Sequence, residues 1–318
     1  MTEHWSERPE GGGRFALKLI RNIGLRCGRK VSRCLLYPIT LYFFLRRGPE
    51  RRSSYDYLQR VLGQRPSVWQ VLRHFHYFAT TIMDRVFLLT AAINRFDVRM
   101  FGVENLHAHM RPDRGVMLVG ANVGSFEVLR ALALTRPETK VRVVLDTQKT
   151  PAMTELLHAL NPDVASTVID AGRPGHEVVL AMHDAMQEGA LATLLGDRAR
   201  PGEATVLVEF LGQPAHFPVA PFLIGSVLKV PIVLCLGLYR GGNRYDLHFE
   251  TLYEQLQLPR RGRDEELRAA VQHYATRLEH HLRIDPYNWF NWYDFWNPET
   301  SHPAEPAVAD VAMSRRAA

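Results

Sequence analysis

Apolar, strand-like runs alternate with helical patterns through the middle of the chain. The runs are short, rich in β-branched or apolar residues, and predict five strands: Gly115–Ala121, Val141–Leu145, Thr167–Ala171, Ala190–Gly196 and Val230–Leu238. Apolar residues at helical spacing fill four segments between them: Glu127–Thr135, Met153–Leu160, His176–Gln187 and Pro221–Leu228. Strands that are apolar throughout need helices on both faces. The pattern therefore predicts an α/β fold with a mixed, mostly parallel central sheet flanked by helices.

Three further segments complete the predicted α/β domain. Val206–Phe210, and a strand pair from Leu238 to Thr251 that turns at Gly241–Asn243, are expected to add antiparallel strands near one sheet edge. Asp264–Ile284 has the pattern of a closing helix. The domain is predicted to cover residues 96–297.

The N-terminal region has a helical, apolar pattern of its own. From Phe15 to Val31 an apolar residue recurs every four positions, which lines one face of a helix. Cys34–Leu45 is almost wholly apolar but shorter than the roughly 20 residues of a spanning helix, and Pro38 is expected to kink it. Residues 14–95 are predicted to form a membrane-associated helical segment. Three placements stay open: in the interface, across the bilayer, or against the protein's own core.

Two helices are predicted later in this segment. The first covers Tyr55–Leu62 and ends at Gly63, and the second starts after Ser67, a suitable N-cap. His74 and His76 lie on the second helix two positions apart, so they point to different faces and predict structural roles rather than metal binding.

Charge and composition add information mainly about the N-terminal region and the two ends of the chain. The net charge is +6, and between Arg14 and Arg52 a dense group of basic residues is opposed by Glu50 alone. Because this block is also rich in Leu, Ile and Phe, it favours an anionic membrane over nucleic acid. The terminal segments 1–13 and 298–318 are polar or of low complexity and are predicted to be disordered.

The cysteines and the first residues indicate in which cellular compartment the protein is expected. Three cysteines, Cys27, Cys34 and Cys235, make an odd number without metal-ligand spacing, so we expect reduced thiols. The polar, glycine-rich first residues are not typical of a signal peptide. No His, Cys and Asp cluster has ligand spacing, so no metal is expected.

The candidate site residues lie where a buried strand is followed by a helix. Sites in open α/β sheets form at the carboxyl ends of strands, and here a small-residue turn contains Gly120, Gly124 and Ser125. The backbone N–H groups of this turn are candidates for binding a thioester oxyanion. Ser125 lacks the Gly-x-Ser-x-Gly pattern and is predicted to be a helix N-cap rather than a nucleophile.

These residues resemble the lysophospholipid acyltransferase superfamily, and within it the bacterial lipid A acyltransferases of the HtrB/LpxL type. That family carries His-x4-Asp/Glu just after such a strand; here Asn122 stands at the histidine position and Glu127 matches the carboxylate. The resemblance extends over about residues 14–296. It includes the basic, apolar N-terminal segment, Gly196-Asp197-Arg198, Phe217–Pro221 and the aromatic ending Pro286–Trp296.

The resemblance implies transfer of a fatty or similar acyl group from acyl carrier protein or CoA to a lipid or lipid-like acceptor. It implies the cytoplasmic face of a bacterial inner membrane, a membrane lipid partner, no cofactor beyond the acyl-ACP or acyl-CoA donor, and no nucleic acid. Asp197 and Arg198 fall in the block that lines the substrate site, although a turn-stabilising ion pair is the alternative. Arg130 is either a substrate contact or a solvated side chain. The aromatic ending predicts either core closure or anchoring among lipid headgroups.

The family's histidine acts as the general base, and its carboxylate orients the imidazole. An amide such as Asn122 cannot take a proton at neutral pH. Three hypotheses stay open. Glu127 serves as the base with its pKa raised by burial, His216 supplies the imidazole, or the protein binds acyl substrate or a partner without turnover. We expect Asn122 and Glu127 to lie side by side, next to a channel for a hydrocarbon chain.

Overall fold

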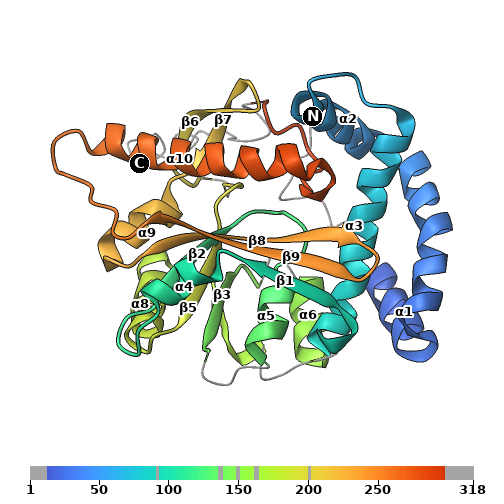
Figure 1. Cartoon of the computed structure of the whole chain (residues 1–318), viewed down its shortest axis with the longest axis horizontal. Coiled ribbons are helices and arrows are strands. Elements are labelled where there is room, and N and C mark those ends of the chain that lie inside the picture. The colour runs from blue at the N-terminus through green and yellow to red at the C-terminus, as the bar shows by residue number, and fades with distance from the viewer. Residues whose placement is uncertain are drawn as a thin grey trace, which may run out of the picture.

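A seven-stranded sheet forms the centre of the molecule (Figure 1). The computed structural model describes residues 13–90, 93–134, 139–147, 151–160, 165–199 and 202–297. The strand order is β1-β9-β8-β2-β5-β3-β4. Its strands are β1 (Asp97–Phe101), β2 (Val116–Gly120), β3 (Val141–Leu145), β4 (Val168–Asp170), β5 (Leu191–Leu195), β8 (Ile232–Gly241) and β9 (Arg244–Tyr253). Neighbours in this sheet are parallel except β8 and β9. The predicted fold class, α/β with a mixed and mostly parallel sheet, is confirmed.

Helices cover both faces of this sheet. They are α4 (Val103–His109), α5 (Glu127–Leu134), α6 (Pro151–Leu160), α8 (Gly175–Gln187), α9 (Ala220–Leu228) and α10 (Arg263–Ile284) in the α/β part of the chain. On β2, Met117 and Val119 belong to a buried cluster with residues of α8, α9 and α10. The alternate residues, Val116 and Leu118, belong to a second cluster with residues of α4 and α5. Side chains of β2 therefore point alternately into two cores, as the all-apolar sequence of this strand requires.

The N-terminal segment forms α1 (Gly13–Arg46), which packs along α3 (Val68–Leu89). The break in α1 lies at Gly28, whose φ of 75° is outside the helical range, and the helix continues through Pro38. The break at Gly28 was not predicted; glycine adopts a positive φ at little cost. In the part of the chain that the structure describes, no helix is long and apolar enough to cross a membrane.

The predicted C-terminus of the next helix and the predicted N-terminus of the helix after it are confirmed. α2 (Gly48–Leu62) ends at Gly63, which has the left-handed conformation of a C-cap. It begins earlier than expected, because Pro49 fits the first turn of a helix. Ser67 caps α3 in a capping box with Gln70.

Other elements differ from the prediction. Val206–Phe210 corresponds to β6 (Thr205–Phe210), which pairs with β7 (Gln213–Pro218) in a separate two-stranded sheet and not at an edge of the central one. β7 contains two prolines, which lack a donor for a sheet ladder, so its sequence did not predict a strand. β1 and α4 were also missed. The predicted disordered ends lie outside the described residues, apart from Gly13, where α1 starts.

The aromatic C-terminal segment closes the core. After α10, a short turn η2 (Pro286–Asn288) leads to Trp289, which is 1% exposed and packs on Phe210 and Phe295. Of the two alternatives for this ending, the described residues therefore show core closure.

Candidate active site

The turn between β2 and α5 is held tightly on two sides. Val123 forms an isolated antiparallel bridge with Trp289, and Gly124 a parallel one with Gly237 of β8. Gly124 has a φ of 56°, and a Cβ built there would lie 1.9 Å from the Gly237 carbonyl oxygen. A glycine is therefore required at this close approach of two backbones. Gly120 ends β2, and its carbonyl accepts a hydrogen bond of 2.7 Å from the Tyr274 hydroxyl.

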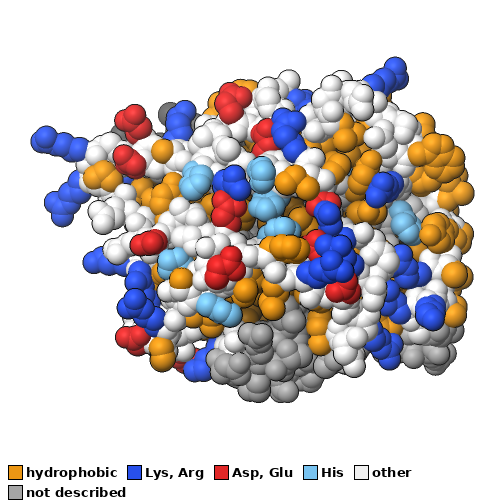
Figure 2. Space-filling view, in the orientation of Figure 1, with side chains coloured by type: hydrophobic (Ala, Val, Ile, Leu, Met, Phe, Trp, Pro, Cys, Tyr) orange, Lys and Arg blue, Asp and Glu red, His pale blue; other side chains and the backbone are white. Residues whose placement is uncertain are grey.

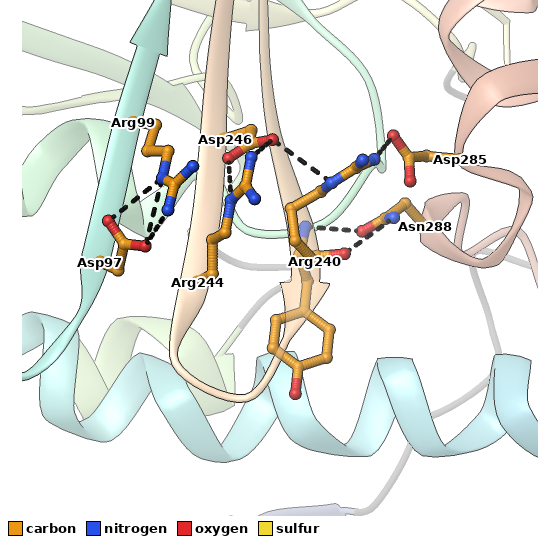
Figure 3. A network of polar contacts seen from close by, with 8 residues as sticks. Asp97, Arg99, Arg240, Arg244, Asp246, Asp285 and Asn288 are labelled. Atoms are coloured by element: carbon orange, nitrogen blue, oxygen red, sulfur yellow. Dashed lines mark hydrogen bonds and ion pairs between the residues drawn. The ribbon is translucent and has the colours of Figure 1, made fainter.

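A polar network fixes the C-terminal segment that supports this turn (Figure 3). The side chain of Asn288 is fully buried, accepts from the backbone N–H of Tyr239 at 2.8 Å and donates to its carbonyl at 3.2 Å. Arg240 bonds Asp285 and lies 3.3 Å from Asp246 of β9. These contacts join η2 to the β8–β9 hairpin. They set the position of the Asn288 carbonyl, which accepts from the N–H of Gly124 at 2.8 Å.

Asn122 is bound to Asp197 and is not paired with Glu127. The Asn122 backbone N–H and side-chain Nδ2 each donate to the Asp197 carboxylate at 3.0 Å. Asp197 is fully buried and also accepts from Trp289 Nε1 at 2.9 Å and Asn291 Nδ2 at 3.4 Å. It follows β5, the parallel neighbour of β2, so the two residues meet at the same edge of the sheet. The sequence predicted both residues for the site but not their pairing.

Arg198 is also held by the C-terminal segment. Its Nε donates to Asn291 Oδ1 at 3.1 Å, and its guanidinium lies 5.4 Å from the ring centre of Tyr293. Asn291 therefore bridges Asp197 and Arg198, a role that the sequence analysis missed. The signal available was the presence of asparagines inside a run of buried aromatic residues, since a buried amide needs partners.

Glu127 lies in a separate, buried ion cluster. Its Oε2 accepts from Ser125 Oγ at 2.8 Å and lies 3.3 Å from Nε of Arg85, a residue of α3. Burial acts to raise the pKa of Glu127. Arg85, the Glu127 backbone, Ser125 and Arg130 act against it, so the pKa is lowered overall. The expectation of a raised pKa is wrong, because Arg85 and the hydrogen bonds together outweigh burial. No local sequence pattern places Arg85 beside Glu127.

Arg130 is part of the same cluster. It is 6% exposed, so it is not a solvated side chain, and among the described residues its Nε has no hydrogen-bond partner. Burial lowers the pKa of Arg130, and Glu127 partly offsets that effect. With Arg85 and Arg130 around one carboxylate, the cluster carries a formal charge of +1, which is favourable for an anionic group nearby.

The turn does not offer the oxyanion site that was expected. The N–H of Gly124 bonds Asn288, and the N–H of Ser125 bonds the Gly237 carbonyl at 2.8 Å. Both donors are satisfied within the protein, so the prediction fails for this conformation. Ser125 is fully buried, so it is not exposed as a nucleophile. Its hydroxyl donates to the Glu127 side chain and does not cap a backbone N–H group of α5 among the described contacts.

His216 lies in a different part of the fold. It belongs to β7, opposite Leu207, and its Nδ1 is 3.1 Å from Thr205 Oγ1 within the hairpin. The groups that bind Asn122 and Glu127 come from other segments: the loop after β5, the β2–α5 turn, α3 and the C-terminal segment.

Two recesses in the described structure lie away from Asn122 and Glu127. One, of about 290 Å³, lies among β3, β4 and α8 and contains Asp184 and Glu188. The other, of about 520 Å³, is lined by basic residues of α1 and by the β8–β9 turn. The expected hydrocarbon channel is therefore not provided by either one. Among the described residues, no group of three or more His, Cys, Asp or Glu side chains is arranged to hold a metal ion.

Comparison with known proteins finds similarity to a solved acyltransferase structure. No family model matches the chain, and no curated protein matches it. The crystal structure of the 1-acyl-sn-glycerophosphate (LPA) acyltransferase PlsC from Thermotoga maritima shares 16% identity, with a TM-score of 0.36. The match covers 80% of this chain and 97% of that chain. A similarity at this level decides neither activity nor substrate.

Proposed function

We propose that this chain transfers an acyl group from a carrier thioester, acyl-ACP or acyl-CoA, to a lipid or lipid-like acceptor at the cytoplasmic face of a bacterial inner membrane. The observation that carries the proposal is the Asn122–Asp197 pair at the carboxyl ends of β2 and β5. This is where α/β enzymes bind their substrates. The amide stands where the resemblance to lipid A acyltransferases places the motif's histidine, and a buried carboxylate fixes it there.

The chemistry requires a nucleophile that does not depend on a strong base. Asn122 cannot remove a proton, and the lowered pKa of Glu127 makes this ion-paired carboxylate a weak base. General-base catalysis contributes about 10²–10⁴-fold, and a hydroxyl acceptor would lose that contribution. An amine with a pKa near 8 is partly neutral at pH 7 and already carries a free lone pair.

An amine-bearing lipid is therefore the acceptor we favour. Its nitrogen would form a bond to the thioester carbonyl carbon, and the C–S bond would then break. The sulfur leaves as a thiol, which takes up the proton that the new amide nitrogen loses. Asn122 and Arg198 are the proposed contacts for the reacting groups, and Asp197 is the residue that positions Asn122.

A second candidate is binding of an acyl substrate or a partner without turnover. The observation that favours it is that the N–H groups of Gly124 and Ser125 are satisfied by internal carbonyls. Acyl transfer would then need another source of oxyanion stabilisation, which typically contributes about 10²–10³-fold.

Asn122→His tests the proposal directly. An imidazole at this position would face Asp197, so the variant would carry a carboxylate-oriented base. We expect it to transfer acyl groups to hydroxyl lipids at least tenfold faster than the natural chain, which should prefer amine lipids. The assay follows thiol release from acyl-CoA and acyl-ACP, with the lipid product identified by mass spectrometry. Asn94→His, at an exposed position, is the matched control.

The results separate the two candidates. If folded natural protein and Asn122→His both fail to transfer any acyl group but retain an acyl lipid through purification, binding without turnover is supported. If neither protein transfers or retains an acyl group, acyl transfer and acyl binding are both wrong, and binding of a partner is the alternative left.

A further inference from the structure

A basic recess lies at the turn of the β8–β9 hairpin. It has a volume of about 520 Å³ and lies between α1, η1 (Ile93–Arg95) and the hairpin turn. Its lining residues are Arg29, Lys30, Arg33, Arg95, Gly242 and Asn243. Four of these six carry a positive charge and none carries a negative one. The recess is outside the candidate active site.

Two of the arginines are fixed in place by the protein. Arg29 donates to both oxygens of Asp84 at 2.8 Å, and Tyr245 donates to the same carboxylate at 2.9 Å. Arg33 donates to the Tyr239 hydroxyl at 3.0 Å. Both arginines also donate to the carbonyl of Gly242 in the hairpin turn. Side chains already held in one conformation lose little entropy when a ligand binds.

The other two cations have no carboxylate partner among the described residues, although the Arg95 guanidinium lies 5.9 Å from the ring centre of Phe87. Lys30 and Arg95 are exposed, and within the described part of the chain neither forms an ion pair. The backbone of Arg95 is fixed, because its carbonyl accepts from Asn243 Nδ2 at 3.1 Å. Asp84 neutralises one of the four charges, so the recess keeps a formal charge of +3.

We propose that this recess binds a phosphate-bearing anion, a phosphomonoester or a pyrophosphate group. Several guanidinium groups around one space suit the oxygens of a phosphate, which accept charge-assisted hydrogen bonds in pairs. A charge of +3 matches a dianion or trianion better than a single carboxylate. The proposal stands on the recess alone and does not depend on acyl transfer.

The recess is connected to the candidate active site through α3. Asp84, which holds Arg29, is followed directly by Arg85, which pairs with Glu127. The recess also lies beyond the carboxyl end of β8, at the same end of the sheet as Asn122. Gly242 lies five positions after Gly237, which contacts the site turn, a span of about 16 Å at the rise of a strand. A phosphate in the recess would therefore bind at a distance from the reacting groups, as a separate subsite.

The phosphate has two possible sources, a lipid headgroup at a membrane surface or a soluble phosphate compound. The first experiment titrates inorganic pyrophosphate into the full-length chain in a calorimeter at low salt. We expect saturable binding that Lys30→Gln combined with Arg95→Gln weakens at least tenfold. Neither side chain has an internal carboxylate partner among the described residues, so this variant should fold. The control is Arg261→Gln combined with Arg268→Gln, which removes the same charge from exposed positions outside the recess.

The second experiment identifies the source. The same proteins are sedimented with phosphatidylcholine vesicles that contain phosphatidic acid, with and without pyrophosphate. Loss of vesicle binding in the recess variant, together with competition by pyrophosphate, supports a lipid phosphate. Pyrophosphate binding without an effect on vesicle binding supports a soluble phosphate compound. The proposal is overturned if pyrophosphate shows no saturable binding, or if the recess and control variants weaken it equally.

Discussion

His74 shows how a buried titratable side chain is held neutral. It is fully buried on α3. Its Nε2 lies 2.8 Å from the Trp289 carbonyl oxygen, which can only accept, so Nε2 carries the hydrogen. Nδ1 is then the acceptor of a 2.8 Å bond from the Ser54 hydroxyl. Burial lowers the pKa of His74 to about 4, against the weaker effect of the Trp289 carbonyl.

The pKa of His74 predicts part of the acid sensitivity of the fold. The folded pKa of about 4 lies below the ordinary value of 6.5, so the unfolded chain binds more protons between these pH values. The free energy of unfolding should therefore fall as the pH drops from about 6.5 to 4, by about 3 kcal/mol in total from this residue. Urea titrations at several pH values measure this slope.

The variant His74→Gln isolates the contribution of His74 to the pH dependence of the free energy of unfolding. A glutamine can accept from Ser54 and donate to the Trp289 carbonyl but does not titrate. The pKa of His281 is also lowered to about 4, but that residue is present in both proteins and cancels in the comparison. An unchanged slope in the variant would show that His74 is not held neutral in the folded state.

At the level of single residues, the sequence predicted where the candidate residues lie in the fold but not which residues they pair with. Asn122 and Glu127 were placed correctly at the end of a strand and the start of a helix. Their partners come from distant parts of the chain: Asp197 is 75 positions from Asn122. The sign of the Glu127 pKa shift depends on Arg85 of α3, and no local pattern indicates that contact. Long-range packing decided the electrostatics of the site.

At the level of elements, the best predictions rest on local chemistry. Ser67 was predicted to cap α3, and its hydroxyl accepts from the Gln70 N–H at 3.3 Å while Gln70 Oε1 accepts from the Ser67 N–H at 2.8 Å. Both partners lie within four residues, so the sequence contains the whole motif. The β6–β7 hairpin was only half predicted. The two prolines of β7 argue against a strand in the sequence. The hairpin forms all the same, with β6 packed on α10.

Ser67→Ala should destabilise the protein modestly. The variant loses the side-chain acceptor for one free N–H at the start of α3, and such losses cost about 1 kcal/mol. Urea unfolding at pH 7 measures the change. The control is Ser53→Ala in the middle of α2, where the hydroxyl only donates to the Pro49 carbonyl within the same helix. If both variants lose the same stability, the cap contributes nothing specific.

At the scale of the whole molecule, α1 has one face that packs on the protein and an opposite face that is exposed. Leu36 and Thr40 are buried against the rest of the protein, whereas Tyr37, Leu41 and Leu45 face outward at a spacing of four residues. Figure 2 shows hydrophobic side chains next to Lys and Arg side chains along the edge that α1 forms. A helix with this outer face suits the headgroup layer of a membrane, as the proposed function requires.

Replacing the outer leucines tests whether this face binds a membrane. Leu41 is 48% exposed and Leu45 66% exposed, so Leu41→Glu combined with Leu45→Glu should leave the fold intact. Burial of a leucine side chain stabilises by about 1.5–3 kcal/mol, so the variant should bind anionic vesicles at least a hundredfold more weakly. Co-sedimentation with phosphatidylcholine and phosphatidylglycerol vesicles measures this. The matched control is Leu180→Glu combined with Val227→Glu, which adds the same charge at exposed apolar positions on α8 and α9. Equal loss of binding in both variants would mean that charge alone governs attachment, and α1 would then have no special part in it.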